Sequence, residues 1–274
     1  MKISILSAIW SRYSLEHAFE AAARCGYDGI DLYGGRPHAY PYDMTPKRID
    51  EVLALKERYH LEIPAYTPEV LAYPFNIASR DEAERADAAK LLDRALDVAH
   101  DLGVKKLQIT SGHSGYDTTR EENLEHLYSV LCPLVEKAGK KDVTVILEPV
   151  TIMESNVTAL VDDMVEILAH VDSPYLKTMM DTVTPPVNRE TYAEHFEKLG
   201  KKIAHMHFVD SNGIDQSHLL LGTGVIDMQG LRDTIRHYGY DGWLTIEVIA
   251  RGIMQPDIVA AGELRYIRKL FDQA

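Results

Sequence analysis

The sequence is poor in cysteine: its 274 residues include only Cys25 and Cys132. Two thiols cannot form the disulfide framework of a small secreted scaffold, and a chain of this length buries roughly three quarters of its unfolded surface without one. Both cysteines fall in segments expected to be helical, so we interpret them as buried thiols rather than as a bridge. This usage is typical of a reducing compartment, and we expect a cytoplasmic protein.

Basic residues are also scarce. The chain has 29 Lys and Arg residues against 42 Asp and Glu residues, a formal net charge of −13 with histidine counted neutral. Nucleic-acid binding needs a basic surface that neutralises phosphates, so this balance argues against DNA or RNA as a partner. The acidic excess suits a neutral or cationic small substrate instead.

Long apolar runs are absent as well. No stretch approaches the roughly 18 consecutive apolar residues of a membrane span. Residues 1–14 contain a short apolar run, but they lack the long hydrophobic region and the small-residue cleavage site of a signal peptide. The sequence therefore predicts a protein with no membrane partner.

The turn after the first expected strand, from Ala8 to Arg12, has no glycine. A doubly wound dinucleotide-binding sheet usually carries a glycine-rich phosphate turn there. Strand-like and helix-like segments alternate along the whole chain, which requires parallel strands joined by crossover helices. The expected strands are 3–8, 29–34, 61–67, 104–110, 143–149, 175–181, 202–210 and 243–249, and the expected helices are 14–25, 46–59, 81–102, 121–139, 156–170, 189–199, 228–237 and 256–271. This pattern predicts an α/β fold, a (β/α)8 TIM barrel, as a single domain over residues 1–274.

Acidic side chains and a histidine lie at the ends of four consecutive expected strands. Glu148, Asp181 and Glu247 belong to the fifth, sixth and eighth strands, and His207 to the seventh. Active sites of TIM barrels lie at the carboxyl ends of the strands, so these side chains should meet. Buried carboxylates without a partner cost several kcal/mol each, a penalty that a divalent cation removes. Ligation by oxygens and one imidazole favours Mn2+, Co2+ or Mg2+ over a structural zinc.

Several other polar residues are candidates for the same rim. His205 and His207 face the same side of their strand, because side chains alternate along a strand, and we choose His207 because it lies nearer the strand's carboxyl end. Tyr66, near the end of the third strand, and His113 and His218, in the loops after the fourth and seventh strands, are expected to contact substrate. Each of the two loop histidines is equally consistent with supporting its loop.

With these residues the sequence resembles the xylose-isomerase-like barrel superfamily, within it the ketose 3-epimerases, and most closely the fructoselysine 3-epimerases. The resemblance covers nearly the whole chain and is carried by the segments GYDGIDLYGGRPHAY, YTPEVLAYPFN, ILEPVTIMESNV, HMHFVDSNG and the final strand ending in Glu247. The ligand set of that family falls on Glu148, Asp181, His207 and Glu247, and its substrate-binding glutamate falls on Glu154. The resemblance implies one divalent ion, Mn2+, Co2+, Ni2+ or Mg2+.

The resemblance also implies the reaction. Glu148 and Glu247 would move protons at C3 of a ketose, which is inverted through a cis-enediolate. Hexose 3-epimerases carry a substrate-binding histidine and arginine where this chain has Thr184 and Gly213. This departure implies a ketose that bears a substituent, with fructoselysine as the leading candidate. Carboxylates near the rim, namely Asp31, Asp43 or Glu69, are candidates to meet an ammonium of that substituent.

Other functions are compatible with the same barrel. A general ketohexose 3-epimerase, an aldose–ketose isomerase or a keto-inositol dehydratase would use the same metal set. A zinc endonuclease would need additional histidines and a basic groove, and a non-catalytic sugar-binding barrel would not need an intact ligand set. We expect a small sugar as the substrate and a homo-oligomer as the assembly.

Overall fold

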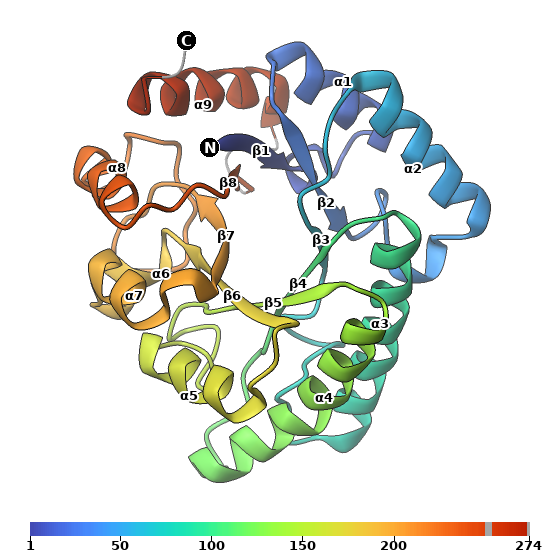
Figure 1. Cartoon of the computed structure of the whole chain (residues 1–274), viewed down its shortest axis with the longest axis vertical. Coiled ribbons are helices and arrows are strands. Elements are labelled where there is room, and N and C mark those ends of the chain that lie inside the picture. Colours follow the sequence, from blue (N-terminus) through green and yellow to red (C-terminus); the bar gives the residue numbers. More distant parts are fainter. Residues whose placement is uncertain (250–253, 273–274) are drawn as a thin grey trace.

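A closed barrel of eight parallel strands forms the centre of the molecule (Figure 1). The computed structural model describes residues 1–249 and 254–272. The strands follow one another around the barrel in sequence order: β1 (Lys2–Leu6), β2 (Gly29–Gly34), β3 (Tyr66–Pro68), β4 (Lys106–Thr110), β5 (Thr144–Glu148), β6 (Leu176–Asp181), β7 (Ile203–Phe208) and β8 (Trp243–Ile246). β8 pairs with β1, which closes the barrel and confirms the predicted (β/α)8 fold.

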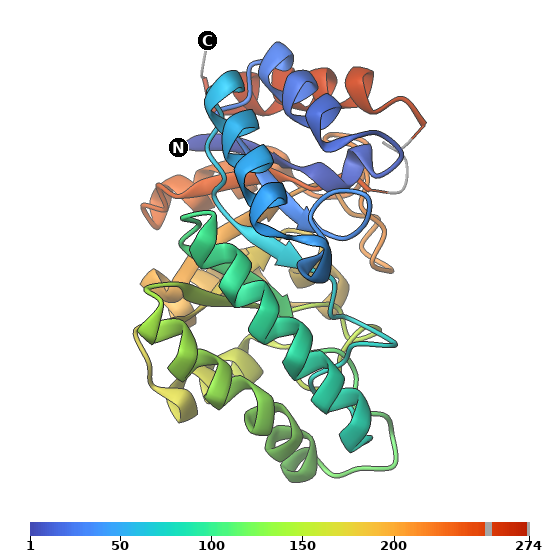
Figure 2. The ribbon, with the colours of Figure 1, turned by 90° about the vertical axis from the view of Figure 1, so that its right-hand side faces the viewer.

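Helices surround the barrel and cover its outer face (Figure 1). Figure 2 shows α3 and α4 lying side by side in this layer. The α-helices are α1 (Leu15–Cys25), α2 (Pro46–Tyr59), α3 (Glu82–Asp101), α4 (Arg120–Lys140), α5 (Val161–Val171), α6 (Thr184–Asn188), α7 (Tyr192–Leu199), α8 (Met228–His237) and α9 (Pro256–Leu270). Short 3-10 helices in the described residues are η1 (Ser7–Trp10), η2 (Pro41–Asp43) and η3 (Gly200–Lys202).

The helix expected over 189–199 is shorter than predicted, and α6 precedes it. Arg189 has a φ of 62°, in the left-handed region, and ends α6. Thr191 then caps α7, because its side chain accepts a hydrogen bond from the amide of Glu194. The sequence prediction missed α6 because two of its five residues, Pro185 and Pro186, have a very low helix propensity, although a helix tolerates proline in its first turn.

Local signals in the sequence set other helix ends. At the start of α1, Ser14 accepts a hydrogen bond from the amide of His17, and Gly26 ends the helix with a φ of 95°. At the start of α4, Thr119 and Glu122 form a reciprocal capping box. These caps fix where each helix starts or stops and so set the lengths of the loops that carry polar residues.

Strand register brings polar residues level at the carboxyl rim, the end of the barrel where the strands terminate. The register between β6 and β7 shifts between Thr178 and Met179, and Asp181 is therefore the partner of His207. Without this irregularity Asp181 would lie opposite Met206. β8 ends at Ile246, one residue before Glu247 and earlier than the predicted strand 243–249. The register shift between β6 and β7 therefore determines which side chains lie opposite each other at the rim.

Apolar side chains fill the space within the barrel and between the barrel and the helices. Cys25 and Cys132 lie on α1 and α4, and both are free thiols that are half-buried rather than buried. Within residues 1–249 and 254–272, no helix is both long enough and apolar enough to cross a membrane.

Candidate metal centre at the carboxyl rim

Four side chains from consecutive strands meet at the carboxyl rim. Glu148 and Asp181 are the last residues of β5 and β6, His207 lies in β7, and Glu247 directly follows β8. Each offers one ligand atom, and these four atoms all lie within 4.8 Å of one another. Their side chains are no more than 12% exposed. The residues that the sequence predicts as ligands are therefore gathered in one buried cluster.

The imidazole of His207 lies between two of the carboxylates. Its Nδ1 is 2.5 Å from Oε2 of Glu247 and 3.4 Å from Oε1 of Glu148. Neither ring nitrogen makes a hydrogen bond of acceptable geometry, although both are buried. Buried imidazole nitrogens normally have a partner, so an unpartnered ring among carboxylates fits a site for a cation.

His218 completes the cluster from above. Its Nε2 lies 3.2 Å from Oδ2 of Asp181 and 3.4 Å from Oε2 of Glu247. Gln108 donates from Nε2 to Oε2 of Glu148 at 3.0 Å. In the part of the chain that the structure describes, no Lys or Arg forms an ion pair with Glu148, Asp181 or Glu247. The excess of negative charge in the cluster is thus balanced only by imidazoles.

The electrostatics of the cluster follow from this arrangement. Burial raises the pKa of Glu148 to about 7, although His207 opposes the shift. Burial also favours the neutral form of Glu247, but the facing rings of His207 and His218 outweigh it and lower the pKa of Glu247. Burial opposes protonation of both imidazoles, yet the carboxylates raise the pKa of His207 and of His218 well above the ordinary value. The carboxylates therefore attract a positive charge to this point.

The donor set fits a divalent cation. Three carboxylates and one imidazole offer the ligands that Mn2+, Co2+ and Mg2+ accept. Gln108 is hydrogen-bonded to Glu148, and the amide of Val183 donates to Oδ1 of Asp181 at 2.9 Å. Such second contacts orient ligand oxygens. Glu148, Asp181, His207 and Glu247 can thus hold one ion.

A cavity of about 160 Å³ opens directly above the cluster. Its wall includes Glu148, Asp181 and Glu247 together with residues of β3 and β4 and of the segments that follow β3, β5, β6, β7 and β8. The polar lining residues are Thr67, Glu69, Gln108, Thr110, Thr151, Glu154, Thr184, Gln216 and His218, and the apolar ones include Leu71, Val150, Val183 and Ile249. A small polar molecule can therefore contact the cluster from this side.

Two of the predicted substrate-binding residues line this cavity. Glu154 accepts hydrogen bonds at Oε2 from the amide (3.1 Å) and the hydroxyl (2.7 Å) of Thr151. Burial raises the pKa of Glu154, while these hydrogen bonds oppose the shift. His218 is the other, and it faces the cavity from the long segment after β7.

The segment that carries His218 is tied to the barrel at both ends. Asp210 accepts hydrogen bonds from the amides of Ser211 (2.8 Å), Gly224 (2.8 Å) and Ile226 (3.2 Å). A Cβ at Gly224 would lie 2.2 Å from the carbonyl oxygen of Ser211, so only glycine fits there. These contacts hold the loop against the barrel and position His218.

Two other predicted substrate-binding residues lie elsewhere. The prediction for Tyr66 is wrong, because its side chain is fully buried and its hydroxyl donates to the carbonyl oxygen of Ala39 at 2.6 Å. His113 does not line the cavity: its Nδ1 accepts a hydrogen bond from the amide of Gly115 at 2.9 Å. Of the two roles open to His113, the structure supports the loop-supporting one.

The three carboxylates predicted near the rim lie in different places. Asp31 is buried inside the barrel, and Asp43 pairs with Arg36 on the surface, so neither lines the cavity. Glu69 does line it. Gln108 is a site residue that the sequence analysis missed. Its signal was a polar side chain within the otherwise apolar end of the strand LQIT.

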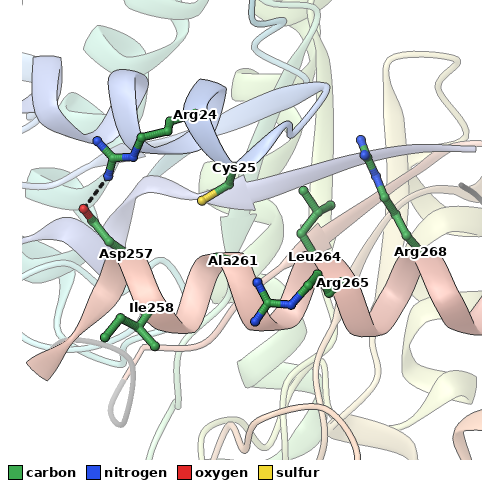
Figure 3. Close-up of a pocket in the computed structure, with 8 residues that line it drawn as sticks. All are labelled: Arg24, Cys25, Asp257, Ile258, Ala261, Leu264, Arg265 and Arg268. Carbon is green, nitrogen blue, oxygen red and sulfur yellow. Dashed lines mark hydrogen bonds and ion pairs between the residues drawn. The ribbon is translucent and has the colours of Figure 1, made fainter.

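A larger hollow of about 590 Å³ lies on the outside of the barrel between α1 and α9 (Figure 3). Its lining includes Cys25, Arg24, Arg265 and Arg268, and Arg24 pairs with Asp257 at 2.6 Å. It shares no lining residue with the cavity at the rim. Of these two cavities, the smaller one is lined by the carboxylates of the cluster, so volume does not identify the candidate site here.

Comparison with known proteins gives a consistent result. The sequence profile described as "Xylose isomerase-like TIM barrel" matches residues 19–270. The fructoselysine 3-epimerase of Escherichia coli O157:H7 is 35% identical over 273 residues, 100% of this chain and 99% of that protein. The L-ribulose 3-epimerase of Methylomonas sp. (strain DH-1) is 25% identical, over 93% of this chain and 85% of that protein.

Solved structures share the fold. A protein described as D-tagatose 3-epimerase-like superposes with a TM-score of 0.83 at 24% identity, covering 99% of this chain and 97% of that chain.

Proposed function

The chain belongs to the xylose isomerase-like TIM barrel family, and on that premise we propose that it is a divalent-metal-dependent isomerase that epimerises a ketose at C3. One observation carries the proposal: a buried Glu–Asp–His–Glu cluster lies under a small polar cavity at the carboxyl rim. The fructoselysine 3-epimerase that matches the full length of the chain supports the reaction class.

The substrate we propose is a ketose with an amine substituent, with fructoselysine first. Thr184 lines the cavity where hexose 3-epimerases have a histidine, and this side chain is too short to replace an imidazole. Among the lining residues that the structure describes, none is Lys or Arg. Such a cavity disfavours a phosphorylated sugar.

Glu148, Asp181, His207 and Glu247 would hold the ion, for which we propose Mn2+, Co2+, Ni2+ or Mg2+. When bound, the ion supplies Lewis-acid polarisation of the carbonyl group next to C3. We also propose that the enzyme acts in the cytoplasm and assembles as a homo-oligomer.

The chain's own residues would move the protons. Glu148 on β5 and Glu247 after β8 reach the cavity from strands that are not neighbours in the barrel. One carboxylate would remove the proton at C3, and the other would return a proton on the opposite face of the resulting cis-enediolate, which inverts the centre. Glu154 and His218 would bind the sugar hydroxyls that line up with them in the cavity.

The test is turnover in deuterated water followed by NMR. For a 3-epimerase, fructoselysine acquires deuterium at C3 and its C3 epimer accumulates, provided that the stripped protein is reloaded with Mn2+ or Co2+. An aldose product with deuterium at C2 would favour the aldose–ketose isomerase, and loss of water would favour the dehydratase. If free fructose, psicose and tagatose react as well as fructoselysine, the enzyme is instead a general ketohexose 3-epimerase.

A further inference from the structure

Glu69 is a cavity carboxylate that has no role in the metal cluster. It directly follows β3 at the carboxyl rim, and its side chain lines the cavity above the cluster. Its one hydrogen-bond partner in the described structure is the phenol of Tyr33, which donates to Oε2 at 3.4 Å. Glu69 is exposed to solvent, and no described Lys, Arg or His forms an ion pair with it.

The surroundings of Glu69 favour a positively charged neighbour. The adjacent protein raises the pKa of Glu69 by desolvation, the phenol of Tyr33 opposes this, and Glu247 adds repulsion in the same direction as burial. The carboxylates of Glu69 and Glu247, which follow β3 and β8, thus repel each other across the cavity that both line. A cation between them would relieve both the desolvation and the repulsion.

Other carboxylates in this region already have partners. Glu154 is held by Thr151, and Asp43 by Arg36. The lining contains five carboxylates, those of Glu69, Glu148, Glu154, Asp181 and Glu247, and no described Lys or Arg. A divalent ion would neutralise two of these five charges. The remaining negative charge is open to a ligand at the position of Glu69.

We propose that Glu69 determines specificity by accepting the ammonium of an amine substituent at C1 of the ketose. A ketose joined through C1 to an amine carries a secondary ammonium one carbon from its carbonyl group. When the carbonyl faces the metal cluster, this ammonium projects into the same cavity that Glu69 lines. The inference rests on the proposed function, and it assigns to Glu69 the choice between charged and neutral substituents.

The test separates charge from size with two synthetic substrates. 1-Butylamino-1-deoxyfructose carries the secondary ammonium, and 1-O-butylfructose has the same length with a neutral ether. For the metal-loaded wild type, kcat/KM should be higher for the amine. Glu69→Gln should lower kcat/KM for the amine about tenfold, the size expected for one charge-assisted hydrogen bond, and leave the ether unchanged. Glu69→Lys should lower kcat/KM for the amine further and leave kcat/KM for the ether unchanged.

Asp43→Asn is the matched control, because Asp43 is a rim carboxylate outside the cavity. This variant should change kcat/KM for neither substrate. Metal content and melting temperature of each variant show whether the fold and the cluster are intact. Equal losses on both substrates, or no loss with Glu69→Gln, would overturn the role of Glu69. If the wild type turned over no ketose at all, the proposed function itself would fail, and that result does not depend on position 69.

Discussion

Two acid–histidine groups lie one above the other in the barrel, and they differ in how their polar atoms are satisfied. In the lower group, Asp31 accepts hydrogen bonds from His205 (2.7 Å), Thr245 (2.9 Å) and Ser4 (3.0 Å), and all four residues are fully buried. In the upper group, at the rim, the carboxylates crowd around a ring that makes no hydrogen bond.

The same strand supplies a histidine to each group, since the ring centroids of His205 and His207 are only 5.7 Å apart. Residue type therefore does not distinguish them. The lower carboxylate has a hydroxyl or imidazole donor for each oxygen, so it needs no further charge. The upper group gathers three carboxylates, which receive hydrogen bonds from Gln108, the amide of Val183 and His218, around a ring whose two nitrogens have no hydrogen bond. This arrangement leaves room for a cation. Nδ1 of His205 is also buried without a partner, so the gathering of three carboxylates around one ring, rather than an unpartnered imidazole alone, indicates where a metal ion belongs.

The contrast between the two groups predicts that matched substitutions in them affect proton exchange at C3 very differently. Glu148→Gln and Glu247→Gln keep the shape of each side chain but remove its ability to take up a proton. We expect each to lower exchange of the C3 hydrogen with deuterated water by at least about 10³-fold. Asp31→Asn should retain most of this exchange once the protein is folded. Near-normal exchange in either glutamine variant would remove that residue from proton transfer.

The two groups should also differ in their contribution to metal binding. Removing the ion with a chelator should abolish activity, and adding Mn2+ or Co2+ should restore it. An ion at about 1,000 times its dissociation constant stabilises the folded state by about 4 kcal/mol, so the melting temperature should rise on adding it. The rise should persist in Asp31→Asn and nearly vanish in Asp181→Asn. Full activity in a sample shown by elemental analysis to be metal-free would contradict the metal site.

The lower group should matter for stability instead. Asp31→Asn replaces a carboxylate that accepts three hydrogen bonds with an amide that accepts at only one of its two ends, which leaves a buried donor unsatisfied at a cost of about 1–3 kcal/mol. Urea unfolding of the metal-free protein measures it, with Asp43→Asn as the exposed control. A loss below about 1 kcal/mol would mean that the hydroxyls of Ser4 and Thr245 hold the network without the charge.

The sequence predicted the upper group because each of its members lies at or near the end of an apolar strand, and strand ends in a parallel barrel share one rim. His207 was preferred to His205 because it lies nearer the carboxyl end of the strand, and His205 bonds to Asp31 in the interior. Tyr66 was misplaced because alternation along a strand does not reveal whether a hydroxyl finds a carbonyl such as that of Ala39. The alignment of Asp181 with His207 depends on a bulge, which no local pattern announces.

Glu263 on α9 is a buried carboxyl group outside both groups, and only some of its hydrogen-bonding capacity is used. It is 5% exposed, and one oxygen accepts the amide of Leu221 at 3.0 Å, in the segment that carries His218. Burial raises the pKa of Glu263 to about 7, with Leu221 opposing and Asp210 adding to the shift. A buried carboxyl with neither a full set of donors nor an ion therefore keeps its proton near neutral pH.

The last predicted effect is a pH dependence of the unfolding free energy, which arises from the proton on Glu263. The unfolded chain releases it above about pH 4.5, whereas the folded protein retains it up to about pH 7, so unfolding is increasingly favoured as pH rises between these values. The contribution of Glu263 to stability is thus complete below pH 4.5 and falls by up to about 3 kcal/mol by pH 7. Glu263→Gln, which stays neutral and keeps an acceptor for Leu221, should lose this dependence. The difference in unfolding free energy between variant and wild type, measured in urea at pH 4.5, 6 and 8 without metal, should grow in favour of the variant. Glu125→Gln, at an exposed position, is the control. A difference that stays constant with pH would show that Glu263 is ionised in the folded protein and that a cation or further donors reach it.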